Sequence, residues 1–140
     1  DALTLASESQ PETLIDVATL TGAIKVGLGA DIAGLFSNTQ NLEKSILKAA
    51  HQAGELLWPM PLFQGYRKQL QTPFADLMNA ADGYGGAIRA ALFLETFIEK
   101  KVPWAHLDIY AWKDAPAGPY TEKGGSGQAV QTLIQYLKSL

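Results

Sequence analysis

A short apolar run that opens into a polar turn is the clearest pattern in the chain. Leu14–Ala18 is rich in Leu, Ile and Val, and Thr19, Leu20, Thr21 and Gly22 follow it directly. A run of this length bounded by turn residues is typical of a buried strand. In α/β sheets the carboxyl ends of the strands face the ligand crevice, and a glycine lets a ligand approach the main chain closely. The pattern therefore predicts a strand that delivers backbone groups to a site.

Further strands are expected later in the chain. Apolar residues predict a short strand near residues 34–37 and a second buried strand over residues 104–110. The segment FADLMNA, residues 74–80, is expected to form a brief edge strand or an extended segment. Pro59 and Pro61 within WPMPLF, residues 58–63, predict a loop there.

Apolar residues at helical spacing predict three longer helices. The first covers residues 42–53, with Asn41 as its N-cap and Gly54 at its end. The second helix covers residues 87–100 and follows a glycine-rich turn. Ser126 is expected to cap the last helix, which runs towards the end of the chain.

The alternation of strands and helices predicts an α/β fold, part of a mixed, largely parallel sheet flanked by helices. Gly27, Gly29 and Gly34 indicate close packing between elements. A length of 140 residues with 47% hydrophobic and 18% charged content suits one soluble domain with a real core. Because the chain lacks an initiator Met and begins in helical sequence, we expect residues 1–140 to be a fragment of something longer.

The charge and the cysteine content limit which kinds of molecule and which metal ions the chain is expected to bind. The formal net charge is −3 and the Lys and Arg residues are scattered, which argues against a nucleic-acid groove or an anionic membrane surface. The chain has no Cys, which excludes disulfides and Cys-based zinc sites and is compatible with the cytoplasm. No apolar run approaches the roughly 20 residues that span a bilayer, so we expect no membrane association.

Few side chains suggest acid/base or metal chemistry. His51 and His106 lie far apart without a second His nearby, and both are interpreted as structural. Asp16 and Asp108 lie inside the two apolar strands. They could form a carboxylate pair for acid/base work or metal binding. The favoured alternative is a buried Asp held by backbone N–H groups or by a neighbouring His.

Nucleophilic and phosphate-binding sites find little support. No Gly-x-Ser-x-Gly elbow accompanies any Ser. The GYGGAI turn, residues 83–88, could offer N–H groups to an anion at a helix start, but its spacing is not that of a dinucleotide fingerprint. Arg89 could reach a carboxylate, although an exposed helical Arg is usually solvated.

Four segments together resemble a known family: LIDVATLTGA, WPMPLFQGYRKQL, FADLMNA and WAHLDIYAW. In this order they are similar to the C-terminal part of the catalytic domain of the leucyl aminopeptidases, the cytosolic metallopeptidase family M17. The similarity runs over nearly all 140 residues. It implies a hydrolase that removes N-terminal amino acids, often leucine, from peptides with two divalent metal ions, zinc or manganese.

The resemblance also implies which roles this chain takes. Family members carry the metal ligands, the catalytic Lys and the catalytic Arg in segments upstream of the part matched here, so no residue of this chain is expected to be catalytic or to bind metal. Thr19, Leu20 and Gly22 match the loop that lines the first specificity pocket and binds the peptide. Family members form homo-hexamers, so the alternative is a non-catalytic structural or assembly module of a pseudoenzyme.

Two departures from the family pattern suggest a divergent bacterial branch. Most members continue the HLDI motif with Ala-Gly, whereas this chain has Tyr110 and Ala111. Tyr110 is therefore a candidate substrate-binding residue that alters the pocket, or else an aromatic core residue at a strand end. The common Thr-Gly-Arg-Pro pattern is replaced by residues 126–129, Ser-Gly-Gln-Ala.

Overall fold

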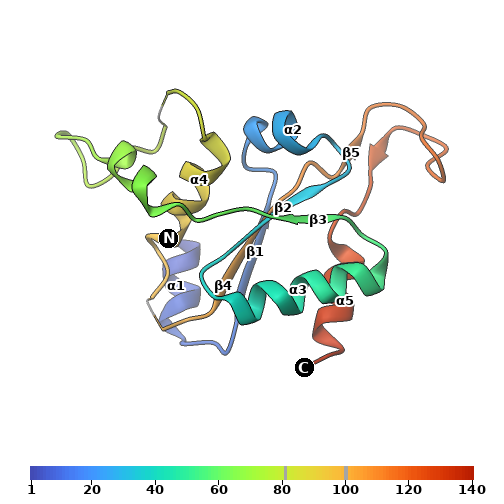
Figure 1. Cartoon of the computed structure of the whole chain (residues 1–140), viewed down its shortest axis with the longest axis horizontal. Coiled ribbons are helices and arrows are strands. Elements are labelled where there is room, and N and C mark those ends of the chain that lie inside the picture. Colours follow the sequence, from blue (N-terminus) through green and yellow to red (C-terminus); the bar gives the residue numbers. More distant parts are fainter. Residues whose placement is uncertain (81, 100) are drawn as a thin grey trace.

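Four strands form the central sheet, in the order β1-β4-β2-β3 (Figure 1). These are β1 (Leu14–Ala18), β4 (Trp104–Asp108), β2 (Ala33–Ser37) and β3 (Leu57–Pro59). The structure is a computed structural model that describes residues 1–80, 82–99 and 101–140. β1 pairs with β4 and β2 pairs with β3 in parallel, whereas β4 and β2 run antiparallel. The prediction of an α/β fold with a mixed, largely parallel sheet is confirmed.

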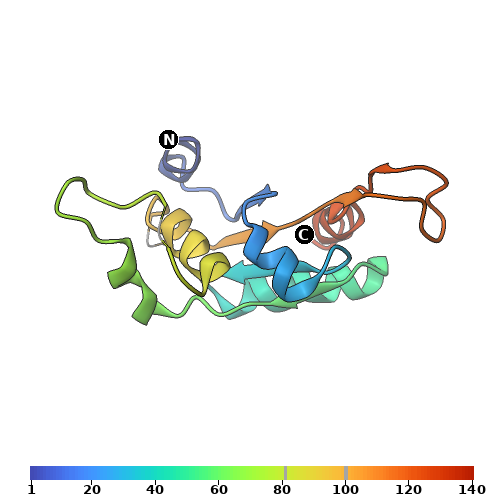
Figure 2. The same cartoon turned by 90° about the horizontal axis from the view of Figure 1, so that it is seen from above.

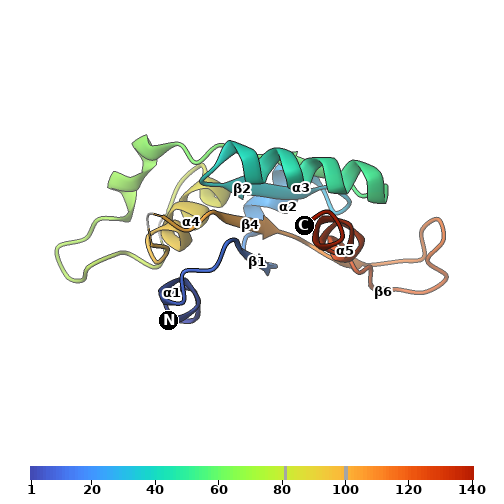
Figure 3. The same ribbon diagram turned by 90° about the horizontal axis from the view of Figure 1, so that it is seen from below.

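Helices cover both faces of this sheet. They are α1 (Ala2–Glu8), α2 (Gly22–Leu28), α3 (Gln40–Ala53), the 3₁₀ helix η1 (Gln64–Leu70), α4 (Gly86–Glu95) and α5 (Val130–Leu137). A small hairpin of β5 (Trp112–Lys113) and β6 (Gly124–Gly125) precedes α5. α3 and α5 lie side by side (Figures 1 and 3), while Figure 2 shows α1 on the β1 side of the molecule and α3 on the β2 and β3 side.

β4 is the centre of the core because its side chains alternate between two apolar layers. Ala105 and Leu107 pack with α3 and α5 in one cluster. Trp104 belongs to a different cluster, and His106 stacks on Phe36 of β2 with ring centroids 5.9 Å apart. Every residue of β4 is buried. Because strands on both sides of β4 satisfy its backbone, this segment matches the prediction of a buried strand.

β1 differs from its prediction in burial. It has a neighbour only on the β4 side of the described sheet, and Val17 is 41% exposed. The sequence indicated burial on both faces because β1 and β4 are equally apolar. An edge position leaves one row of backbone groups unpaired, which the residue types do not reveal.

Several predicted boundaries are wrong. α3 begins at Gln40 with Thr39 as its N-cap, not with Asn41. Ala129, not Ser126, is the N-cap of α5. α4 ends at Glu95, because the backbone tightens into i→i+3 bonds as Ile98 enters the Trp104 cluster. The end predicted at Lys100 lies outside the described residues.

Two loop and strand predictions also change. WPMPLF contributes β3, a short edge strand whose last residue is Pro59. Proline is tolerated there because an edge strand needs fewer backbone donors. FADLMNA forms neither an edge strand nor an extended segment: its first two residues lie in the turn closed by the bridge between Thr72 and Ala75, and bends follow over most of the rest.

One of the three glycines predicted to allow close packing does so. A Cβ on Gly34 would lie 2.5 Å from Cδ1 of Ile24, which α2 presses onto β2. A Cβ on Gly27 or Gly29 would meet no atom within 4 Å. Gly29 instead ends α2 with a positive φ of 79°, a conformation that glycine adopts without strain.

Replacing Gly34 by Val should lower the free energy of unfolding by about 1–3 kcal/mol, because Ile24 is buried and has nowhere to move. Gly27→Ala is the matched control: with open space around it, the helix should gain up to about 1 kcal/mol. Thermal unfolding of the purified protein measures both. A Gly34→Val protein that unfolds at the wild-type temperature would contradict the close approach.

Candidate functional site

The loop of residues 19–22, Thr19, Leu20, Thr21 and Gly22, lies at the carboxyl end of β1. The register pairs Ala18 with Asp108, so this loop starts where β4 also ends. The Thr21 side chain accepts a hydrogen bond from Ile24 N at 3.1 Å and so caps α2. Thr19, Leu20 and Gly22 are exposed. The 19–22 loop is thus an accessible turn between a strand and a helix N-terminus.

A buried carboxylate holds this loop from below. Asp108 is 0% exposed, and its Oδ1 accepts hydrogen bonds from Leu20 N at 3.2 Å and Thr21 N at 3.3 Å. The Thr21 hydroxyl donates to Oδ2 at 2.7 Å. The structure therefore supports the favoured interpretation of Asp108, a buried acid satisfied by backbone N–H groups.

Asp16 has different partners and does not pair with Asp108. It lies opposite His106 in the register, and His106 Nδ1 donates to its Oδ1 at 2.6 Å. Trp104 Nε1 donates to its Oδ2 at 2.7 Å. The neighbouring His in the structural interpretation is thus His106. The alternative of a carboxylate pair for acid/base chemistry finds no support in this arrangement.

Tyr110 follows β4 and packs against α2 rather than in the core. It is partly buried, and the ammonium of Lys25 lies 3.6 Å from its ring centroid. Its hydroxyl donates weakly to Asp114, at 3.3 Å from Oδ2. The interaction with the phenol, reinforced by Asp114, raises the pKa of Lys25 above its usual value of 10.5, against a smaller lowering by desolvation.

Gln128, a position where the sequence showed no sign of a role in the site, holds the turn after Tyr110. Gln128 Oε1 accepts hydrogen bonds from Tyr110 N at 3.0 Å and Ala111 N at 3.1 Å. Ala111 has a φ of 53°, an uncommon conformation for a residue with a Cβ. Gln128 thus fixes the direction in which Tyr110 leaves β4. Lys25 and Asp114 carried no sequence signal, because only the fold brings them to Tyr110.

Arg89 is buried, which corrects the expectation of a solvated side chain. It is 5% exposed, and its guanidinium donates to the carbonyls of Asp82 and Gly83, the latter at 2.9 Å. Gly86, at the start of the same helix, packs so closely that its Cβ would lie 3.2 Å from that of Ala23. The glycine turn therefore lies beside the start of α2, next to the 19–22 loop.

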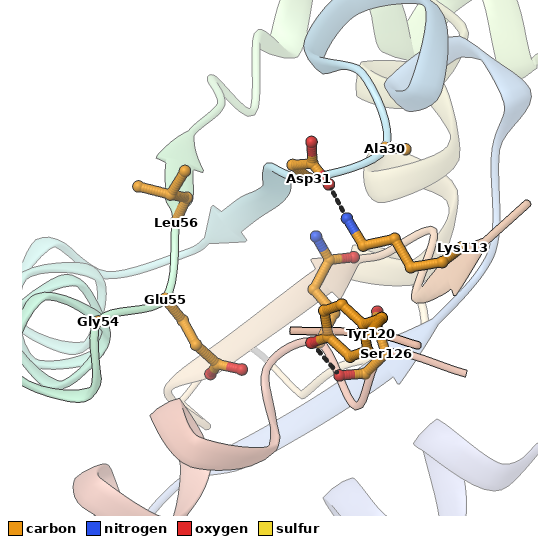
Figure 4. A pocket seen from close by; sticks show the side chains of 9 residues that line it. Ala30, Asp31, Gly54, Glu55, Leu56, Lys113, Tyr120 and Ser126 are labelled. Carbon is orange, nitrogen blue, oxygen red and sulfur yellow. Dashed lines mark hydrogen bonds and ion pairs between the residues drawn. The ribbon is translucent and has the colours of Figure 1, made fainter. Parts of the chain in front are cut away.

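A hollow of about 200 Å³ is lined by Gln128, which binds the amides of the Tyr110 turn, and by eight further residues (Figure 4). Its polar groups already have partners. Lys113 forms an ion pair with Asp31, and the Tyr120 hydroxyl donates to Ser126 O at 3.0 Å. Glu55 accepts bonds from the amide and hydroxyl of Thr132 at 2.7 and 2.6 Å and so caps α5. The polar side chains that line this hollow therefore connect neighbouring parts of the fold to one another.

The described residues do not fit a metal centre by themselves. No three His, Cys, Asp or Glu side chains among them gather where they could hold an ion. His51 lies exposed in the last turn of α3, far along the chain from the buried His106. In the same described ranges, no helix combines the length and apolar character needed to cross a bilayer.

Two solved structures share this arrangement. The cytosol aminopeptidase from Coxiella burnetii superimposes with a TM-score of 0.92 at 39% identity, over 99% of this chain and 30% of that one. The bottromycin maturation enzyme BotP, solved in complex with Mn, gives a TM-score of 0.93 at 39% identity, over 99% of this chain and 32% of that one.

Sequence comparison decides the family. The model of the catalytic domain of the cytosol aminopeptidase family matches residues 1–134. The chain belongs to this family. A Prochlorococcus marinus protein named "Probable cytosol aminopeptidase" is 47% identical over 141 residues, which cover 99% of this chain and 29% of the relative. The chain thus spans less than a third of that relative's length.

Ala129, the residue after Gln128, has an uncommon backbone conformation. The resemblance places it where the family pattern has Pro, and its φ is 72°. Proline is locked near −65° and is excluded from this conformation. The preceding Gln128 holds the Tyr110 turn, so the two departures from the family pattern lie in contact with each other.

Proposed function

We propose that residues 1–140 are the C-terminal portion of the catalytic domain of a metal-dependent aminopeptidase. The whole enzyme would release N-terminal amino acids, leucine or similar ones, from peptides. The observation that carries this proposal is the exposed 19–22 loop, hydrogen-bonded to Asp108 at the carboxyl end of β1, in a chain of the cytosol aminopeptidase family. Ligands of α/β sheets bind at such carboxyl ends.

Other parts of the longer protein would supply the metal chemistry. Two divalent ions, manganese or zinc, would activate the attacking water and polarise the scissile carbonyl. Manganese is supported by BotP, which was solved in complex with Mn. A homo-hexamer and a cytoplasmic location follow the family resemblance and the name of the relatives, cytosol aminopeptidase.

Thr19, Leu20, Gly22 and Tyr110 would contribute the substrate site of this segment. Fixed backbone groups that hydrogen-bond a peptide hold the scissile bond in one orientation, which accelerates reaction without any titratable side chain. The side chain of Tyr110, which lies against Lys25 of the helix that follows the loop, would border the pocket for the N-terminal side chain.

An activity assay tests the proposed function. The longer protein encoded by the gene, supplied with Mn²⁺ or Zn²⁺, should release leucine from a leucine anilide and from leucine peptides. The isolated 140-residue chain should give background only. Prior removal of metal with a chelator and an N-acetylated peptide are the controls, and both should abolish release. A folded, metal-supplied longer protein without activity would identify an assembly module instead.

Gly22→Val should lower kcat/KM sharply, by about 10-fold or more, because the new side chain fills space that the peptide backbone needs. The substitution should not strain the fold itself, because Gly22 has no positive φ and a Cβ there would meet no atom within 4 Å. Thermal unfolding should therefore stay near the wild-type temperature. An unchanged kcat/KM would show that the loop does not touch substrate.

Tyr110→Ala should widen the pocket and shift preference towards larger N-terminal side chains, since removing the phenol leaves space beside α2. Competition between leucine and phenylalanine peptides measures the shift as a ratio of kcat/KM values. Tyr120→Ala, in the hollow that Gln128 lines, is the matched aromatic control and should leave that ratio unchanged. Identical ratios for wild type and Tyr110→Ala would assign Tyr110 to packing.

A further inference from the structure

We propose that Asp108 is the positioning residue of the substrate loop: its carboxylate would fix residues 19–22 so that their outward backbone groups are aligned with a peptide main chain. This inference rests on the proposed role of the 19–22 loop in substrate binding. Asp108 lies beneath the loop and would act only through it, without touching substrate itself.

The first support is the concentration of loop donors on one buried group. Two consecutive amides, those of Leu20 and Thr21, and the Thr21 hydroxyl all donate to Asp108. Hydrogen bonds to a charged acceptor are stronger than bonds between neutral groups. A carboxylate with both oxygens occupied by one short loop leaves that loop little freedom to change its backbone angles.

Thr21 extends this control to the next helix. Its hydroxyl donates to Asp108 Oδ2 at 2.7 Å and accepts from Ile24 N at 3.1 Å. One side chain therefore connects the end of β4, the loop and the first turn of α2. Because Ile24 is itself buried against β2, the position of the loop is tied to the core.

The second support is the set of backbone groups that Asp108 leaves free. Over the described parts of the chain, the carbonyl of Leu20 and the N–H of Gly22 have no hydrogen-bond partner. Both residues are exposed. An acceptor and a donor two residues apart on an exposed turn are complementary to the donors and acceptors of an extended peptide. The backbone groups on the inner side of the loop are thus hydrogen-bonded to Asp108, whereas those on its outer side remain available to a peptide.

The requirement is for a carboxylate, because all three loop groups are donors. Asn in place of Asp108 has only one acceptor oxygen. It could keep the two amide bonds to its oxygen, but its NH₂ group would face the Thr21 hydroxyl without accepting its proton. Ala would leave all three donors without this partner. Loop order should therefore fall from wild type through Asp108→Asn to Asp108→Ala.

The test uses the longer protein with Asp108→Asn, Asp108→Ala, Thr21→Val and Thr21→Ser. Asp16→Asn is the matched control, because it alters the other strand aspartate without touching the loop. Misplacing a substrate-orienting group by about 1 Å costs about 100-fold in rate. We expect losses of about that size in kcat/KM for Asp108→Ala and Thr21→Val, with a fall in kcat as well as a rise in KM.

Rescue and a structural readout complete the experiment. Thr21→Ser keeps the hydroxyl and should keep most of the activity, and Asp16→Asn should leave kcat unchanged. Hydrogen exchange should show the Leu20 and Thr21 amides protected in the wild type and freely exchanging in Asp108→Ala, while β4 amides stay protected. General unfolding would expose all of them together.

The outcomes separate this inference from the proposed function. Wild-type kcat/KM in Asp108→Ala, or unchanged exchange of the two loop amides, overturns the positioning role. A wild-type protein that is inactive overturns the proposed function. In that case, loss of amide protection in Asp108→Ala still supports loop positioning by Asp108, and retained protection still overturns it.

Discussion

The parallel pairing of β1 with β4 is the constraint on which the candidate site depends. It places Ala18 opposite Asp108, so the loop that leaves β1 passes over a carboxylate at the end of β4. The same register places Asp16 opposite His106, where a hydrogen bond of 2.6 Å joins the two strands. A slip of β1 by one residue would turn Asp16 to the opposite face, into the apolar layer of α3 and α5, and would move the start of the 19–22 loop away from Asp108. The register and the polar contacts therefore stabilise one another.

Three polar side chains, two of them buried, hold backbone near the candidate site. Asp108 binds the 19–22 loop, Arg89 binds the carbonyls of the glycine turn, and Gln128 binds the amides after β4. Each of these side chains satisfies main-chain groups that neither helix nor sheet could pair. The segments they hold lie at or beside the ends of β1 and β4. Irregular segments held on a rigid scaffold are where proteins commonly place binding residues.

The departures from the family pattern form one connected unit. Tyr110 contacts both Lys25 and Asp114, which form an ion pair at 3.7 Å, while Gln128 binds its backbone amide, and Ala129 follows with a φ that excludes proline. A larger side chain after the HLDI motif and an altered segment before α5 therefore belong together. A change at one of these positions should alter the effect of a change at another, because contacting residues rarely contribute independently.

The sequence by itself determined the fold class, the family and the positions of the main strands and helices. Strand and helix periodicity depend on local residue order, so Leu14–Ala18, the buried β4 and the long helix before Gly54 could be predicted. The roles of Asp108, Arg89 and Gln128 depended on partners 88, 6 and 18 residues away, and only the tertiary structure brought these together. The partial exposure of β1 also escaped prediction, because its edge position depends on which strands lie beside it. Local pattern specifies the elements, whereas the partner of a buried polar group is a property of the assembled sheet.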